Sequence, residues 1–297
     1  MPLNLLLVLR SLALPLAMLL TAMVYLRGWL HLRSAAVSVI PPWRAISFFL
    51  GLFLIWTAVG SPVAELDEQS LTIHMIQHLL LMTFAPPLIW LGAPLMPLLH
   101  GLPRRFVQMA VAPALRWAPI QGLGRLLGRP LFCWLAATAA LVGWHIPSAF
   151  TLALNSEAWH GVEHLCFLGA GLLFWWPVVE PWPNVTNQPR WPILLYLFLG
   201  TIPCDMLSGF LVFCDRVVYA AYLSAPGHFG MSALEDQQCA GALMWMCISV
   251  VYLVPAAILT IQLLGMRHPH PAVMASPGLG TIVAPQGESQ KMEASCG

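Results

Sequence analysis

The sequence has few charged residues. Only 8% of its 297 residues are Asp, Glu, Lys or Arg, whereas 59% are hydrophobic and the mean hydropathy is +0.77. Soluble domains carry about 25% charged residues, so a water-soluble fold is excluded and the lipid bilayer is the expected solvent. The net charge at pH 7 is +1 and no block of basic residues is present, which argues against nucleic acid as a partner.

The motifs of several enzyme classes are also missing. The chain has no Walker loop, no nucleophile elbow and no HExxH motif, so we expect ligand binding rather than catalysis. Its seven cysteines include no CxxC pair, and most lie in apolar segments, where a thiol behaves as a small hydrophobic group. The sequence therefore predicts no disulfide framework.

Seven apolar segments are long enough to cross about 30 Å of hydrocarbon as helices. They are predicted at 5–26, 44–60, 71–91, 130–147, 158–179, 191–213 and 238–264. We interpret the first as a retained helix rather than a signal peptide, because no small-residue cleavage site follows it. The expected fold class is an all-α membrane bundle in residues 1–266, with short surface helices within 99–129 and a disordered tail at 267–297.

Basic residues are distributed unevenly between the segments that connect these spans. The segments on one side of the membrane hold every Lys and Arg except Arg10 and Arg216, and the loop at 61–70 on the other side carries only acidic charges. Cytoplasmic segments collect Lys and Arg. We therefore expect the N-terminus outside and the C-terminal tail in the cytoplasm.

Several histidines lie in or at the ends of the predicted spans: His74, His78, His145, His160 and His164. All five fall in the outer layer of the membrane, although their positions played no part in the orientation. The first two and the last two are i, i+4 pairs, so each pair places its imidazoles on one helix face. A single membrane histidine often only joins helices by a hydrogen bond, but ionisable groups in hydrocarbon are costly and suggest function.

Neutral imidazole is the commonest metal ligand, so these five histidines predict a shared metal site. Met75 and Met82 on the third span and Met206 on the sixth are possible soft ligands. Thioether together with imidazole favours copper. Haem is the alternative cofactor, because two histidines from facing helices can hold its iron axially.

Three acidic residues are further candidates for function. Glu163 precedes His164 and either supports it or reaches the membrane interface. Asp205 lies well inside the sixth span, where an acid is costly, so we expect it to be functional. Asp236 precedes the seventh span, where helix capping also explains an acid.

Several motifs share their order and spacing with the CtaG family of bacterial membrane proteins implicated in cytochrome c oxidase assembly. They include Tyr25–Trp29, His74–His78, Ala85–Leu88, Trp144–Pro147, Glu163–His164, Leu172–Pro177 and Asp236–Gln238. The chain resembles this family over about 25–253. The resemblance implies a multi-helix assembly factor for a haem–copper oxidase in the bacterial inner membrane, with copper handling as its expected role and oxidase subunits or a copper chaperone as its partners.

The leading hypothesis is therefore a non-enzymatic assembly factor. It would bind copper near the outer face of the membrane through some of the five histidines, and then hand the ion to an oxidase subunit or a partner chaperone. Two alternatives stay open. One is a haem-binding membrane redox protein, and the other is a transporter of copper or protons in which Asp205 would act as the gate.

Overall fold

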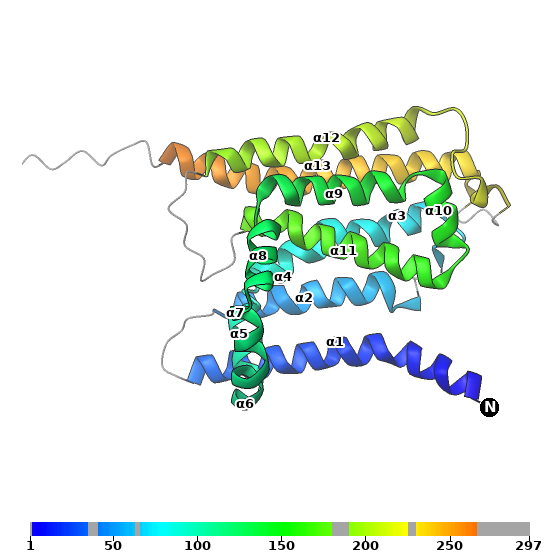
Figure 1. Ribbon diagram of the computed structural model, residues 1–297. Helices are drawn as coiled ribbons and strands as arrows, with labels where there is room; N and C mark the ends of the chain where they lie inside the picture. Colours follow the sequence, from blue (N-terminus) through cyan, green and yellow to red (C-terminus); the bar gives the residue numbers. More distant parts are fainter. Residues whose placement is uncertain (1, 35–40, 63–65, 180–189, 225–229, 266–297) are drawn as a thin grey trace, which may run out of the picture.

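The structure is a computed structural model that describes residues 2–34, 41–62, 66–179, 190–224 and 230–265. Within these ranges the chain forms helices and connecting turns and contains no strand, which confirms the predicted all-α class. Long helices lie side by side, and a series of short helices crosses one end of the bundle (Figure 1). The predicted tail at 267–297 lies outside the described residues.

Six stretches in the described ranges are long and apolar enough to cross a membrane. They are Ala13–Ser34 of α1 (Pro2–Ser34), α2 (Pro42–Val59), the stretch formed by α3 (Leu71–Leu79), η2 (Leu80–Phe84) and α4 (Ala85–Leu91), α11 (Glu157–Val179), α12 (Trp191–Phe213) and α13 (Ala233–Gly265). A seventh, α9 (Pro130–Trp144), qualifies only together with α8 (Ala118–Leu127), from which it is bent by 74°. Six to seven spans agree with the predicted bundle.

The helix α1 continues to Ser34, beyond the predicted end at 26, and two further helix ends differ from the prediction for local reasons. The helix α13 begins at Ala233 rather than at 238 because Ser232 and Glu235 form a capping box. The Glu235 carboxylate accepts a hydrogen bond from the Ser232 backbone N–H at 2.7 Å, and the Ser232 hydroxyl accepts one from the Glu235 N–H at 3.3 Å. The helix α9 ends before the predicted 147 because Pro147 disfavours helical backbone at Ile146, which is extended.

Short helices cross the end of the bundle where α1 and α4 end and α9 begins (Figure 1). They are α5 (Leu95–Gly101), α6 (Arg104–Phe106), η3 (Val107–Val111), α7 (Ala112–Arg116) and α8. The last four lie within 99–129, where one or two short helices were predicted. The backbones of α1 and α5 are in contact at Gly28, where the absence of a side chain is needed. A Cβ at this position would collide with the Pro97 carbonyl. We call this end of the bundle the arginine end, after the arginines of this segment.

The lateral surface of the bundle is strongly apolar. Some of its large side chains are 70–74% exposed, among them Leu131, Leu165, Met206, Phe213 and Ile261. Soluble monomers rarely expose so much contiguous apolar surface, whereas lipid tails solvate such side chains without penalty. The surface is thus that of a multi-pass membrane protein.

The third span contains a π turn, η2, which follows from its two prolines. Pro86 and Pro87 donate no backbone hydrogen bond, and in a regular α-helix their rings would clash with the carbonyls four residues earlier. The wider turn at Leu80–Phe84 relieves this conflict. Gly171 of α11 packs directly on the turn, since a Cβ there would lie 2.6 Å from the Met82 carbonyl oxygen.

Candidate metal centre

The structure brings together all five histidines that the sequence singled out, at the end of the bundle opposite the arginine end. The ring centroid of His74 lies 4.3 Å from that of His78 and 5.4 Å from that of His160. The His164 ring lies 4.2 Å from that of His160, and the His145 ring lies 6.0 Å from that of His78. We call these residues the histidine cluster. They converge because α3 and α11 begin, and α9 ends, at the same end of the bundle.

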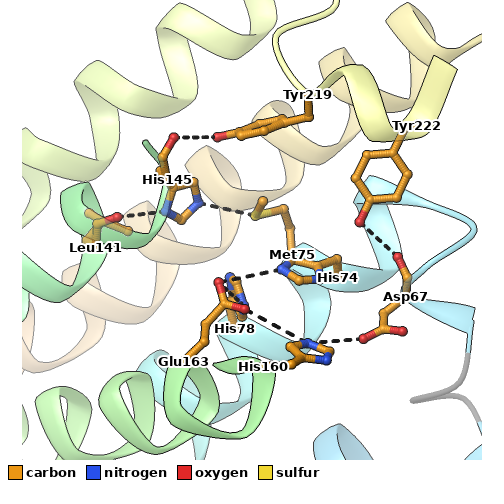
Figure 2. A network of polar contacts seen from close by, with 10 residues as sticks. All are labelled: Asp67, His74, Met75, His78, Leu141, His145, His160, Glu163, Tyr219 and Tyr222. Carbon is orange, nitrogen blue, oxygen red and sulfur yellow. Dashed lines mark hydrogen bonds and ion pairs between the residues drawn. The ribbon is translucent and has the colours of Figure 1, made fainter. Parts of the chain in front are cut away.

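Glu163 lies inside the histidine cluster and is fully buried (Figure 2). Its Oε1 lies 3.8 Å from His74 Nε2 and 3.5 Å from His78 Nε2, and its Oε2 lies 3.9 Å from His160 Nε2. Of the two roles that the sequence left open, the structure therefore excludes the membrane interface. The carboxylate faces histidines of both helix pairs, but among the described residues no ion pair joins it to His164, the neighbour that the sequence expected it to support.

A second acid, Asp67, was missed as a site residue and counted only as a charge in the loop at 61–70. Its side chain is 5% exposed, and its Oδ2 lies 3.2 Å from His160 Nε2 (Figure 2). Its position in the sequence could have identified it. Asp67 lies shortly before the first histidine pair, in a loop predicted on the same side of the membrane as the histidines.

Asp236 holds the start of the helix that carries His74 and His78. Its carboxylate accepts hydrogen bonds from the backbone N–H groups of Leu71 and Thr72, at 2.7 and 3.2 Å, and from the Ser70 hydroxyl at 3.0 Å. The expectation that it caps its own helix was therefore incomplete, since the capping box serves α13. Asp236 caps α3 from a neighbouring helix and fixes the first histidine pair relative to α13.

His145 stands at the point where α9 stops. Its Nδ1 contacts the Leu141 carbonyl at 2.7 Å, and its Nε2 lies 3.4 Å from the Met75 sulfur (Figure 2). Met75 is fully buried. Of the three methionines named from the sequence, this is the one whose sulfur contacts a histidine of the cluster in the described part of the chain.

The other two methionines lie elsewhere. Met206 is 72% exposed on α12, so its thioether points away from the histidine cluster. Met82 lines a small internal cavity with Thr83 and Cys204, one turn beyond His78. The sequence named these methionines by their place on the third and sixth spans, and that place alone does not say which way a side chain points.

Asp205 lies in the middle of α12 and is partly buried. Its Oδ1 is buried without a hydrogen-bond partner. Among the residues that the structure describes, no ion pair joins it to the histidine cluster. Its functional role therefore stays a prediction.

Aromatic side chains cover the histidine cluster. Phe150, from the short helix α10 (Pro147–Leu154), packs on the His74 ring at 4.9 Å and on the Tyr219 ring at 4.1 Å. The Tyr219 hydroxyl donates to the His145 carbonyl at 3.2 Å, and the Tyr222 hydroxyl donates to the Asp67 carbonyl at 2.9 Å (Figure 2). Burial raises the pKa of both tyrosines above its usual range, which keeps both hydroxyls protonated as donors.

The segment that carries these tyrosines is held by Gln237, which the sequence noted only as part of the Asp236–Gln238 motif and not as a site residue. Its side chain is fully buried. The side-chain carbonyl accepts from the Val218 N–H at 2.7 Å, and the side-chain amide donates to the Arg216 carbonyl at 3.1 Å. Gln237 thus ties the connection that follows α12 to the second turn of α13.

The cluster contains many buried polar atoms without hydrogen-bond partners. They include both ring nitrogens of His74 and of His78 and both carboxylate oxygens of Glu163. Buried polar atoms almost always have partners, so this concentration indicates a binding site. Two groups of three ligands, Asp67–His74–His160 and His74–His78–Glu163, each have their ligand atoms within 4.8 Å of one another. Two imidazoles and a carboxylate suit a transition-metal ion.

Comparison with known proteins shows which family this chain matches. The model of the family described as cytochrome c oxidase caa3 assembly factor matches residues 23–265. Two proteins described as uncharacterized, one from Mycobacterium bovis and one from Mycobacterium tuberculosis, are each 25% identical over 244 residues. The match covers 75% of this chain, and the chain spans only 34% of the length of each relative. No solved structure matches the chain.

Proposed function

The chain belongs to the family of cytochrome c oxidase caa3 assembly factors, and on this premise we propose that it binds copper in the histidine cluster and hands the ion on during assembly of a haem–copper oxidase. The observation that carries the proposal is the buried group of His74, His78 and Glu163, whose ligand atoms lie close together and have no hydrogen-bond partners. Copper is the cargo in this account. Ligand exchange alone moves it, so no catalytic step is required.

The two ligand groups suggest a path for the ion. The His160 side chain is 20% exposed and pairs with Asp67, whereas the His78 side chain is 6% exposed and faces the fully buried Glu163. The two groups share His74. An ion would enter or leave at the first group and rest at the second, and the shared imidazole allows it to pass without losing all of its ligands.

Orientation and partners are part of the same proposal. The short helices that carry the arginines lie at one end of the bundle, and the histidine cluster lies at the opposite end (Figure 1). With the arginine end in the cytoplasm, the cluster faces the outer side of the bacterial inner membrane. An oxidase subunit or a copper chaperone would then exchange the ion there, through the loop that carries Asp67.

The two alternative functions have less support. A haem between facing histidines needs a gap for its macrocycle, but Phe150 and Phe167 pack directly on the rings of His74 and His78, with centroids 4.9 and 4.1 Å apart. Transport of copper or protons is favoured by the buried, unpartnered oxygen of Asp205 alone. A difference spectrum tests for haem, and ion flux into liposomes tests for transport.

The direct test is metal analysis of the full chain purified from copper-supplied cells without added metal. We expect copper in the wild type and its loss in the double variant His74→Ala/His78→Ala. The matched control is His31→Ala/His100→Ala, which removes two exposed histidines at the arginine end. Equal copper content in all three proteins, or none in the wild type, would contradict the proposal.

A further inference from the structure

The contact between His145 and Met75 has an unusual chemical character. A carbonyl oxygen can only accept a hydrogen bond, so the 2.7 Å contact with Leu141 places a proton on His145 Nδ1. In the neutral ring the other nitrogen, Nε2, then carries a lone pair. That lone pair faces the Met75 sulfur at 3.4 Å. A thioether has no hydrogen to donate, so two electron-pair donors face each other inside the protein.

A cation between the two atoms accounts for this arrangement better than a second proton does. A doubly protonated ring would be a buried charge, since His145 is 5% exposed. Within the described residues, no carboxylate lies within ion-pair distance of His145. Metal–nitrogen bonds of about 2.0 Å and metal–sulfur bonds of about 2.3 Å at a tetrahedral angle separate nitrogen from sulfur by about 3.5 Å. The observed separation is 3.4 Å.

We propose that Met75 and His145 form a separate position for a soft monovalent ion, the cuprous state of copper. This inference rests on the proposed function and refines it. Thioether ligands select cuprous copper, whereas the carboxylate-bearing groups suit divalent ions. His78 supplies a third ligand, because both its ring nitrogens lack hydrogen-bond partners and its ring lies 6.0 Å from that of His145. The soft position therefore adjoins the His74–His78–Glu163 group and shares His78 with it, and Met75 and His145 distinguish the two. The histidine cluster thus sorts copper by oxidation state along its length.

The test compares silver(I), which mimics cuprous copper without redox chemistry, with zinc(II) as a divalent probe. Both are titrated into the full chain in detergent micelles for the wild type, Met75→Leu and Met82→Leu. Met82 is the matched control, because it lies on the same span but lines a different cavity. Loss of a ligand should cost at least as much as loss of an outer-shell partner, which is about 10–100-fold in affinity.

We therefore expect silver affinity to fall at least about tenfold in Met75→Leu and to change little in Met82→Leu, with zinc affinity unchanged in both. Cysteine thiols also bind silver, but they are the same in all three proteins. Leucine is close to methionine in volume, so folding should survive. X-ray absorption of the silver-loaded wild type provides a second readout, and the sulfur signal should weaken in Met75→Leu alone.

Three results would overturn the inference. If Met75→Leu binds silver as the wild type does, the sulfur is not a ligand. If it loses silver and zinc equally, the soft position is not separate from the carboxylate-bearing groups. In both cases the wild type still binds metal, and the proposed function stands. If the wild type binds neither ion, the proposed function fails together with the inference.

Discussion

Replacement of Asp236 by alanine should destabilise the start of α3, which is far from Asp236 in the sequence. The carboxylate is 7% exposed and receives three hydrogen bonds at the start of α3, at 2.7, 3.0 and 3.2 Å. A hydrogen bond to a charged group contributes about 1.5–3 kcal/mol, and removing one partner leaves the other buried and unpaired. The bonds share one carboxylate and water can replace part of them, so we expect a loss of about 2–4 kcal/mol in the free energy of unfolding.

The assay is unfolding of the detergent-solubilised protein with increasing SDS. Cu²⁺ affinity is measured separately, at a temperature at which the variants remain folded. The matched control is Glu235→Ala, which removes the adjacent acid. Glu235 is exposed and caps only α13. Asp236→Ala should cost more stability and should also weaken Cu²⁺ binding, because His74 follows the capped turn directly. If Glu235→Ala costs as much, or if Asp236→Ala leaves both readouts unchanged, the cross-helix cap does not hold the site.

Further predictions concern packing, orientation and Asp205. Gly171→Ala places a methyl group 2.6 Å from the Met82 carbonyl and should cost about 1–3 kcal/mol of stability. Gly169→Ala meets nothing within 4 Å and should be neutral or slightly stabilising in the same SDS titration. A reporter fused after Arg129 should be active only in the cytoplasm, and one at Asp67 only outside; the reverse pattern would refute the orientation. Asp205→Asn should impair oxidase assembly while the protein still accumulates, and normal oxidase activity would mean that this acid is not functional.

The spans and the histidine cluster were predictable from sequence because each depends on a regular pattern. Hydropathy identifies the helices, and i, i+4 spacing places His74 with His78 and His160 with His164 on single faces. Since adjacent spans alternate in direction, the depth of each pair also follows from its place in the chain. These rules place the histidines in one layer of the membrane. That the two pairs face one another depends on helix packing and is seen only in the structure.

The partners of the histidines were not predictable in the same way. Asp236 accepts hydrogen bonds from the start of α3, and Gln237 bonds to the connection that follows α12. Both contacts depend on which helices pack against α13, which the sequence does not show. Asp67 lies in a loop, for which no periodicity gives an orientation. Met206 lies on the predicted sixth span but faces outward, because the rotation of a helix about its axis is set by the helices packed against it.

The central claim is that the two histidine pairs serve one metal site, and its most direct test is Cu²⁺ affinity in three variants. His74 belongs to both ligand groups, whereas His160 belongs to one. His74→Ala/His78→Ala should therefore abolish most Cu²⁺ binding, and His160→Ala/His164→Ala should weaken it less. The combined variant should bind no worse than the first, because residues that act as a unit are not additive. Losses that add in the combined variant, or full Cu²⁺ retention in it at normal membrane levels, would contradict the account.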